Sequence, residues 1–232
     1  YDTYNKLKLS LLGVSTGSNT MGWTFALNIG VLSVVALKPA VAVANPKVAT
    51  LSDTFPPLKW NLFTMNNGVV TEADELRMTP APMTITSWAG LYSLAKYDLT
   101  GSRCFVELVD AGAGNTWVDL TLSTQPLSSD NFFSIGVDTG LGMLQAGDEI
   151  NGTFVVRNQI TYNPVNHRWL QIREASGTVY FEYSADGVTW STLDSRAAAM
   201  AITDLYIVLD DFAYNASGTP GTAIFANFNV TP

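Results

Sequence analysis

The sequence predicts an all-β fold, either a sandwich or a barrel. Runs rich in β-branched and aromatic residues alternate with clusters of Gly, Pro, Asn, Asp and Ser, which is the spacing typical of such folds. No stretch keeps the i, i+3, i+4, i+7 apolar pattern of an amphipathic helix. The best helical candidate, residues 195–200, has three consecutive alanines and is long enough for one or two turns.

Composition is consistent with one large β domain. The chain has 232 residues, of which 47% are hydrophobic and only 14% charged, against about 25% charged in a typical soluble protein. Such a chain can bury a sizeable core. Its net charge of −8 argues against nucleic acid as a partner, because phosphate recognition needs clustered Lys and Arg.

Charge divides the chain into two parts. Residues 1–49 contain one acid and four bases, whereas residues 50–232 contain 19 acids and eight bases. The first part is also strongly apolar and has no polar face of its own. We therefore expect residues 1–49 to form an extended arm that packs on the body, on copies of itself or on a host assembly. Residues 50–232 are expected to form the sandwich.

The expected strands can be placed by their apolar runs. They cover residues 60–63, 68–70, 76–78, 90–94, 104–110, 117–123, 132–137, 153–156, 169–173, 179–183, 205–209 and 224–230. The sharpest turn is expected at residues 183–188, because Asp186-Gly187 lies between two apolar runs. Gly tolerates positive φ there, and Asp bonds to its own backbone.

Several classes of site and location are disfavoured. The single cysteine, Cys104, cannot form an intramolecular disulfide, and a lone His167 makes a histidine-based metal or catalytic site improbable. Residues 25–44 are apolar but are interrupted by Asn28, Lys38 and Pro39, so no membrane span is expected. No secretory signal peptide is visible, and the chain begins at Tyr1 without Met.

Four segments, in order, resemble the concanavalin A-like lectin/glucanase domains. Residues 52–55 read SDTF with a Trp soon after, and residues 90–93 read GLYS. Residues 97–102 read YDLTGS, and residues 224–230 read IFANFNV. The resemblance covers residues 50–232 and implies a two-sheet antiparallel jelly-roll sandwich.

A second resemblance joins the arm to this body. Residues 167–193 read HRWLQIREASGTVYFEYSADGVTWSTL. A short apolar N-terminal part followed by such a domain resembles structural proteins of tailed bacteriophages, including minor tail, fibre and capsid-decoration proteins. It implies a virion location after synthesis in the host cytoplasm. It also implies contact with other virion proteins through residues 1–49 and a homo-oligomeric or lattice-bound state.

The acids do not follow the glucanase pattern. Glucanase relatives carry E-x-D-x-x-E along a strand, whereas the nearest string here is residues 72–75, EADE, in an expected turn. Two carboxylates must flank the scissile bond, so no catalytic residue is predicted. Asp210-Asp211 and Asp148-Glu149 are adjacent pairs that should point to opposite faces of a strand. No metal ligands or cofactor are therefore predicted, with calcium left open.

Strand alternation indicates a candidate glycan-binding face. Aromatic rings can stack on sugars, while carboxylates, amides and guanidinium groups bond hydroxyls. The residues expected to share one sheet surface are Trp117, Asp119, Trp169, Gln171, Arg173, Tyr180 and Glu182. The alternative is that these side chains cover the sheet or contact a neighbouring subunit.

Three functions remain open from the sequence. The favoured one is a non-enzymatic bacteriophage virion protein that displays a lectin-like sandwich and adheres to host-surface polysaccharide. The second is a carbohydrate-binding module of a secreted protein. The third, less favoured, is a glycoside hydrolase.

Overall fold

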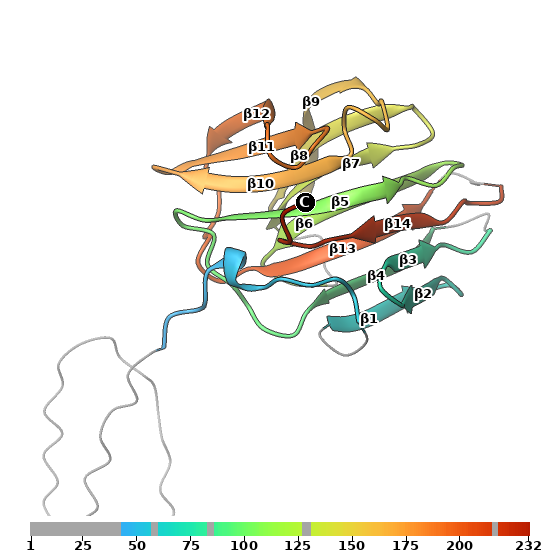
Figure 1. Cartoon of the computed structure of the whole chain (residues 1–232), viewed down its shortest axis with the longest axis horizontal. Coiled ribbons are helices and arrows are strands. Elements are labelled where there is room, and N and C mark those ends of the chain that lie inside the picture. Colours follow the sequence, from blue (N-terminus) through green and yellow to red (C-terminus); the bar gives the residue numbers. More distant parts are fainter. Residues whose placement is uncertain (1–42, 57–59, 83–85, 127–130, 215–217) are drawn as a thin grey trace, which may run out of the picture. The chain divides into compact units, whose positions relative to one another are not determined.

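The computed structural model describes residues 43–56, 60–82, 86–126, 131–214 and 218–232. These residues form two antiparallel β-sheets of seven strands each (Figure 1). The predicted two-sheet jelly-roll sandwich is therefore confirmed. The only helix among the elements of this part of the chain is η1 (Val48–Thr50), a single 3-10 turn. No helix of the described residues is long and apolar enough to cross a membrane.

The two sheets are named sheet 1 and sheet 2. Sheet 1 has the strand order β1 (Trp60–Met65), β4 (Ser87–Ser93), β13 (Tyr206–Ala213), β6 (Thr116–Ser123), β7 (Asn131–Asp138), β8 (Met143–Ile150) and β9 (Thr153–Thr161). Sheet 2 has the order β12 (Ser191–Ala197), β11 (Thr178–Ser184), β10 (Trp169–Ala175), β5 (Arg103–Asp110), β14 (Ala223–Ala226), β3 (Leu76–Thr79) and β2 (Val69–Glu72).

Alternation along the strands builds the core between the sheets. On β6, Val118, Leu120 and Leu122 are fully buried, and on β10 so are Leu170 and Ile172. Successive strand residues point to opposite faces. The residues of β6 that alternate with these three therefore point away from the core. Each buried Leu, Ile or Val contributes about 1.5–3 kcal/mol of hydrophobic stabilisation.

Two strands, β8 and β12, were missed by the sequence prediction. β8 escaped because its apolar run is broken by polar residues, including Asp148. Asp148 accepts hydrogen bonds from Arg157 Nε at 2.7 Å and from Arg196 Nη1 at 3.0 Å. Arg196 belongs to β12 of the other sheet, so this buried ion pair ties the sheets together.

The predicted helix at residues 195–200 is wrong. Residues 195–197 continue β12, which pairs antiparallel with β11. Alanine favours helices in isolation, but the pairing of Arg196 with Val179 fixes the extended conformation. Tertiary pairing therefore overrides local propensity here.

Both ends of the sandwich meet at one place. The side chain of Asn229 donates to the carbonyl oxygens of Val48 and Leu51, and its Oδ1 accepts from the Phe105 amide. Asp53 forms a β-bridge with Phe228. Residues 43–49, assigned to the arm from sequence, thus belong to a compact unit that spans Val43–Pro232. The rest of the predicted arm, residues 1–42, lies outside the described residues.

The turn expected at residues 183–188 is present between β11 and β12. Asp186 Oδ1 accepts the backbone amides of Val188 and Thr189, and the Ser184 hydroxyl accepts the amide of Gly187. Gly187 has φ +70°, a conformation that glycine adopts without strain. These backbone hydrogen bonds hold the pKa of Asp186 well below its usual value.

Candidate functional site

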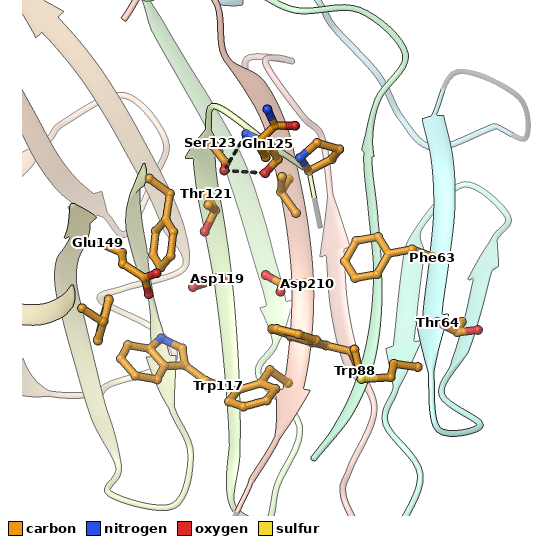
Figure 2. A pocket seen from close by; sticks show the side chains of 16 residues that line it. Phe63, Thr64, Trp88, Trp117, Asp119, Thr121, Ser123, Gln125, Glu149 and Asp210 are labelled. Atoms are coloured by element: carbon orange, nitrogen blue, oxygen red, sulfur yellow. Dashed lines mark hydrogen bonds between the residues drawn. The ribbon is translucent and has the colours of Figure 1, made fainter. Parts of the chain in front are cut away.

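A cleft lies on the outer face of sheet 1. It has a volume of about 450 Å³ and is lined from β1, β4, β6, β7, β8, β9 and β13. Figure 2 shows Asp119 and Asp210 near its centre, with Trp117 and Trp88 beneath them. The lining residues are Phe63, Thr64, Met65, Trp88, Trp117, Asp119, Thr121, Ser123, Gln125, Pro126, Phe132, Glu149, Phe154, Val208, Asp210 and Phe212.

A pair of opposed carboxyl groups lies at the floor of the cleft. Asp119 of β6 is directly opposite Asp210 of β13 in the antiparallel register, and both side chains line the cleft. Both residues remain partly exposed to solvent. A ligand in the cleft can therefore reach both carboxyls.

Burial and the neighbouring charge make Asp119 the protonated member. Burial raises the pKa of Asp119 well above its usual value, and the charge of Asp210 raises that pKa further. Burial also raises the pKa of Asp210, but contacts with Asp119 and Trp88 oppose that rise. Asp119 therefore holds a proton more readily than a free aspartic acid does.

Two glycines keep the space beside the pair open. Gly90 is the cross-strand neighbour of Asp210, and Gly136 is the neighbour of Asp119. A Cβ at Gly90 would lie 2.6 Å from the Phe63 ring, and one at Gly136 would lie 2.3 Å from Asp119 Cβ. A larger side chain at either position would force the neighbouring cleft residues to move.

Aromatic rings flank the carboxyl pair on both sides. Trp117 packs edge-on against Phe154 at 5.0 Å, and Phe154 stacks on Phe132 at 5.8 Å. On the β4 and β13 side, the rings of Trp88 and Phe212 are 4.8 Å apart. These flat apolar surfaces beside partly exposed acids can hold sugar rings while the carboxyls contact polar oxygens.

The adjacent acids behave as alternation predicted. Asp211 is fully buried, whereas its neighbour Asp210 lines the cleft. The side chain of Asp148 is 1% exposed and forms ion pairs, whereas its neighbour Glu149 lines the cleft. The prediction that each pair divides between the two faces of its strand is therefore confirmed.

The seven predicted glycan-binding residues do not share one surface, so the prediction is wrong on this point. Trp117 and Asp119 lie in the cleft of sheet 1. The other five lie on β10 and β11 of sheet 2. Alternation identifies which side chains avoid the core, but it does not reveal which strands belong to the same sheet. The five are Trp169, Gln171, Arg173, Tyr180 and Glu182.

The five sheet 2 residues mostly bind one another. Gln171 and Arg173 donate to Glu182, the latter through Nε at 2.8 Å and Nη2 at 2.9 Å. The Arg173 guanidinium lies 3.7 Å from the centre of the Tyr180 ring. Trp169, Gln171 and Glu182 are at most 4% exposed. The structural alternative, that these side chains cover the sheet, fits this arrangement.

Several cleft residues escaped the sequence analysis. Asp210, Phe212 and Trp88 lie on the same face as the carboxyl pair but come from strands remote from β6 in sequence. The alternation of residues 206–213 places Asp210 and Phe212 on one strand face, and that signal was available. Their pairing with Asp119 depends on strand order, which the sequence did not reveal.

A metal site is not apparent in the described part of the chain. It contains no group of three or more His, Cys, Asp or Glu side chains that could hold a metal ion. The Asp119–Asp210 pair offers only two carboxyls, and burial raises the pKa of both. The calcium ion left open from sequence therefore has no ligand set among these residues.

Comparisons with known proteins identify the fold. The chain is similar to a β-glucanase of Bacillus licheniformis (TM-score 0.58, 13% identity), covering 77% of this chain and 95% of the other. It is also similar to an endo-β-1,3(4)-glucanase from family GH16 (TM-score 0.54, 10% identity), covering 77% and 89%. The exoplasmic/lumenal domain of VIP36, in a Ca2+/Man3GlcNAc-bound form, gives TM-score 0.56 and 14% identity, covering 78% and 89%. No family model and no curated protein matches the sequence.

These similarities define the class as a concanavalin A-like jelly roll, the fold of glucanases and of carbohydrate-binding lectin domains. They contradict the prediction that the chain is not an enzyme, because glycoside hydrolases stand among the most similar solved structures. The sequence search considered only acids that lie along one strand, whereas the cleft places one carboxyl from β6 opposite another from β13.

Proposed function

We propose that this chain is a carbohydrate-active protein that binds a saccharide chain in the sheet 1 cleft and hydrolyses a glycosidic bond there. The observation that carries the proposal is the pair of opposed carboxyls, Asp119 and Asp210, which lies in the cleft between two aromatic walls and has raised pKa values. The similarity to glucanases supports it.

The two carboxyls have different roles. Asp119 holds the proton and donates it to the glycosidic oxygen as the bond to the anomeric carbon breaks. The Asp210 carboxylate stabilises the positive charge that develops on the sugar ring and accepts a proton from the attacking water. The water hydroxyl adds to the anomeric carbon, which completes hydrolysis.

The lining favours a neutral saccharide. Asp119, Glu149 and Asp210 are its only charged residues, and none of the described lining residues is Lys or Arg. An acidic polymer would bring further negative charge close to these carboxyls in a partly buried site, where repulsion is strong. A neutral chain instead stacks on the rings and bonds the acids through its hydroxyls.

The experiment is hydrolysis of a polysaccharide panel, measured by release of reducing ends. We expect turnover of neutral β-glucans but not of polyuronates. Asp119→Asn and Asp210→Asn should each lower kcat about 100-fold or more. Glu75→Gln, an exposed acid paired with Arg77, is the matched control. Activity should fall as pH rises through the raised pKa of Asp119, because the donor is then lost.

Two other outcomes would change the assignment. Binding of neutral glycans without turnover would make the cleft that of a carbohydrate-binding module. Full activity in both Asp variants would overturn the roles given to the pair. Retained circular dichroism spectra of the variants are needed to interpret either result.

The virion role stays a prediction from sequence resemblance. It concerns contacts through residues 1–49, of which residues 1–42 lie outside the described part of the chain. We test it by comparing the solution mass of the full chain with that of a variant starting at Val43, where the compact unit begins. Assembly of the full chain alone would support a virion component. Two monomers would contradict it.

A further inference from the structure

A group of aromatic side chains continues beyond the cleft along sheet 1. Tyr92 of β4 and Tyr206 of β13 follow Trp88 and Phe212 on the same strand faces, at even spacings. The Phe63 ring, which lines the cleft, is 6.2 Å from that of Tyr92. We define Tyr92, Tyr206 and Lys96 as the tyrosine patch.

The tyrosine patch adjoins the cleft directly. Tyr206 is the antiparallel partner of Ser123, which lines the cleft, and Figure 2 shows Ser123 with Gln125 at that end. Along β13, Tyr206 lies four residues from Asp210, about 13 Å along the strand. A saccharide long enough to leave the cleft in this direction reaches the patch.

The chemistry of the patch fits a sugar unit. The rings of Tyr92 and Tyr206 meet edge-on at 5.9 Å, and both residues are partly exposed. Neither hydroxyl is hydrogen-bonded to another described residue. The patch therefore offers apolar ring surface together with two hydroxyls that can bond to a ligand.

Charge at the patch favours a neutral ligand, as in the cleft. Lys96 Nζ lies 5.3 Å from the centre of the Tyr206 ring and 2.7 Å from Asp204 Oδ2. The cation is thus paired with an acid of the same chain and supplies no net positive charge. The contact of Lys96 with the Tyr206 ring stabilises the orientation of that ring.

We propose that the tyrosine patch is an additional saccharide-binding subsite, which holds sugar units of the chain whose reacting bond lies at Asp119 and Asp210. This inference rests on the proposed function and specifies its ligand: a neutral oligosaccharide that extends along β4 and β13. Short ligands occupy only the cleft, whereas longer ones also contact the tyrosine patch.

The test is calorimetric titration at low temperature with β-1,3-1,4-gluco-oligosaccharides of three and of eight glucose units. Chromatography of the ligand afterwards checks that it was not cleaved. In the unaltered protein, we expect the longer ligand to bind on the order of tenfold more tightly. Tyr206→Ala should remove this advantage and leave affinity for the short ligand unchanged, because the contact worth about tenfold is lost.

Three further variants make the result decisive. Tyr206→Phe keeps the ring and should retain most of the advantage, and Tyr206→Leu replaces Tyr206→Ala if the latter does not fold. Tyr180→Ala, a half-exposed tyrosine on sheet 2, is the matched control.

Equal affinity for both lengths, or an unchanged advantage in the Tyr206 variants, would overturn the subsite while leaving the cleft proposal intact. No binding or cleavage of either ligand or of the polysaccharide panel would overturn both.

Discussion

Asp211 is an acid in the apolar interior of the sandwich. Its side chain is fully buried, and its cross-strand partners are Ala89 and Val118, which are also fully buried. Neither carboxyl oxygen makes a hydrogen bond of normal geometry with the described residues. Burial raises the pKa of Asp211 well above its usual value, and the charge of Asp210 raises it further.

This arrangement destabilises the fold at neutral pH. A buried polar group without a full hydrogen bond costs about 1–3 kcal/mol. Contacts with the Thr116 hydroxyl and the Ala223 amide favour the charged form and offset only part of the cost of its burial. We expect Asp211→Val to raise the free energy of unfolding by about 1–3 kcal/mol. The melting temperature should rise by about 2–4 °C for each kcal/mol.

The pH dependence gives a second, independent readout. The folded pKa of Asp211 is raised above its unfolded value of about 4, so the folded state binds more protons. Its contribution to stability is present below pH 4 and is lost as pH rises toward the folded pKa. Asp211→Asn should therefore reduce the loss of stability between pH 4 and pH 8. Asp119 and Asp210 will maintain part of that loss, because burial raises their pKa values too.

The assay is urea unfolding of the three proteins at pH 4, 5.5, 7 and 8. Greater stability of Asp211→Val at pH 7, with a shallower pH dependence in both variants, would support the reasoning. A less stable Asp211→Val protein with an unchanged pH slope would refute it. In that case the contacts of Asp211 with Thr116 and Ala223 would outweigh its burial.

Three other expectations concern named side chains. Asp148→Asn should lower the free energy of unfolding by about 3 kcal/mol, because it removes the buried carboxylate that pairs with both Arg157 and Arg196 and leaves Arg196 with Asp194 alone. Glu75→Gln, from a pair near the surface, should cost under about 1 kcal/mol. Equal losses in the two variants would contradict this reasoning. The single His167 imidazole should titrate below pH 6.5 by NMR, because burial lowers its pKa. The free energy of unfolding should therefore fall as pH drops below 6.5. A pKa at or above 6.5 would show that burial does not control the titration of His167. Burial raises the pKa of Cys104 to about 12, so a thiol reagent at pH 8 should label it only after unfolding, and rapid labelling of the folded protein would argue against its burial.

Side-chain alternation carried most of the fold prediction. Strands with a regular apolar pattern, such as β5 and β6, were predicted within a residue or so of their bounds. β8 was missed because its inner face carries Asp148, whose charge is tolerated there only through Arg157 and Arg196. Such compensation comes from partners distant in sequence, and a local pattern does not reveal it.

The site was harder to predict than the fold. Alternation correctly turned Trp117 and Asp119 away from the core, and both line the cleft. It also turned Trp169 outward, but from the other sheet. Which outward faces meet is set by strand order, in which β6 lies between β13 and β7. The pairing of Asp119 with Asp210 follows from this order and from register.

The hydrogen bonds that Asn229 makes to Val48 and Leu51 bear on how this sandwich can be built into larger proteins. A polypeptide that enters near Val48 leaves close to Asn229, because the Asn229 side chain bonds directly to the backbone of Val48 and Leu51. A host loop can therefore accept the whole unit as an insertion without separating its own ends. For the same reason, the ends can be joined by a short linker and the chain reopened at the Asn151–Gly152 turn. Such a circular permutant should keep the same core and the same cleft.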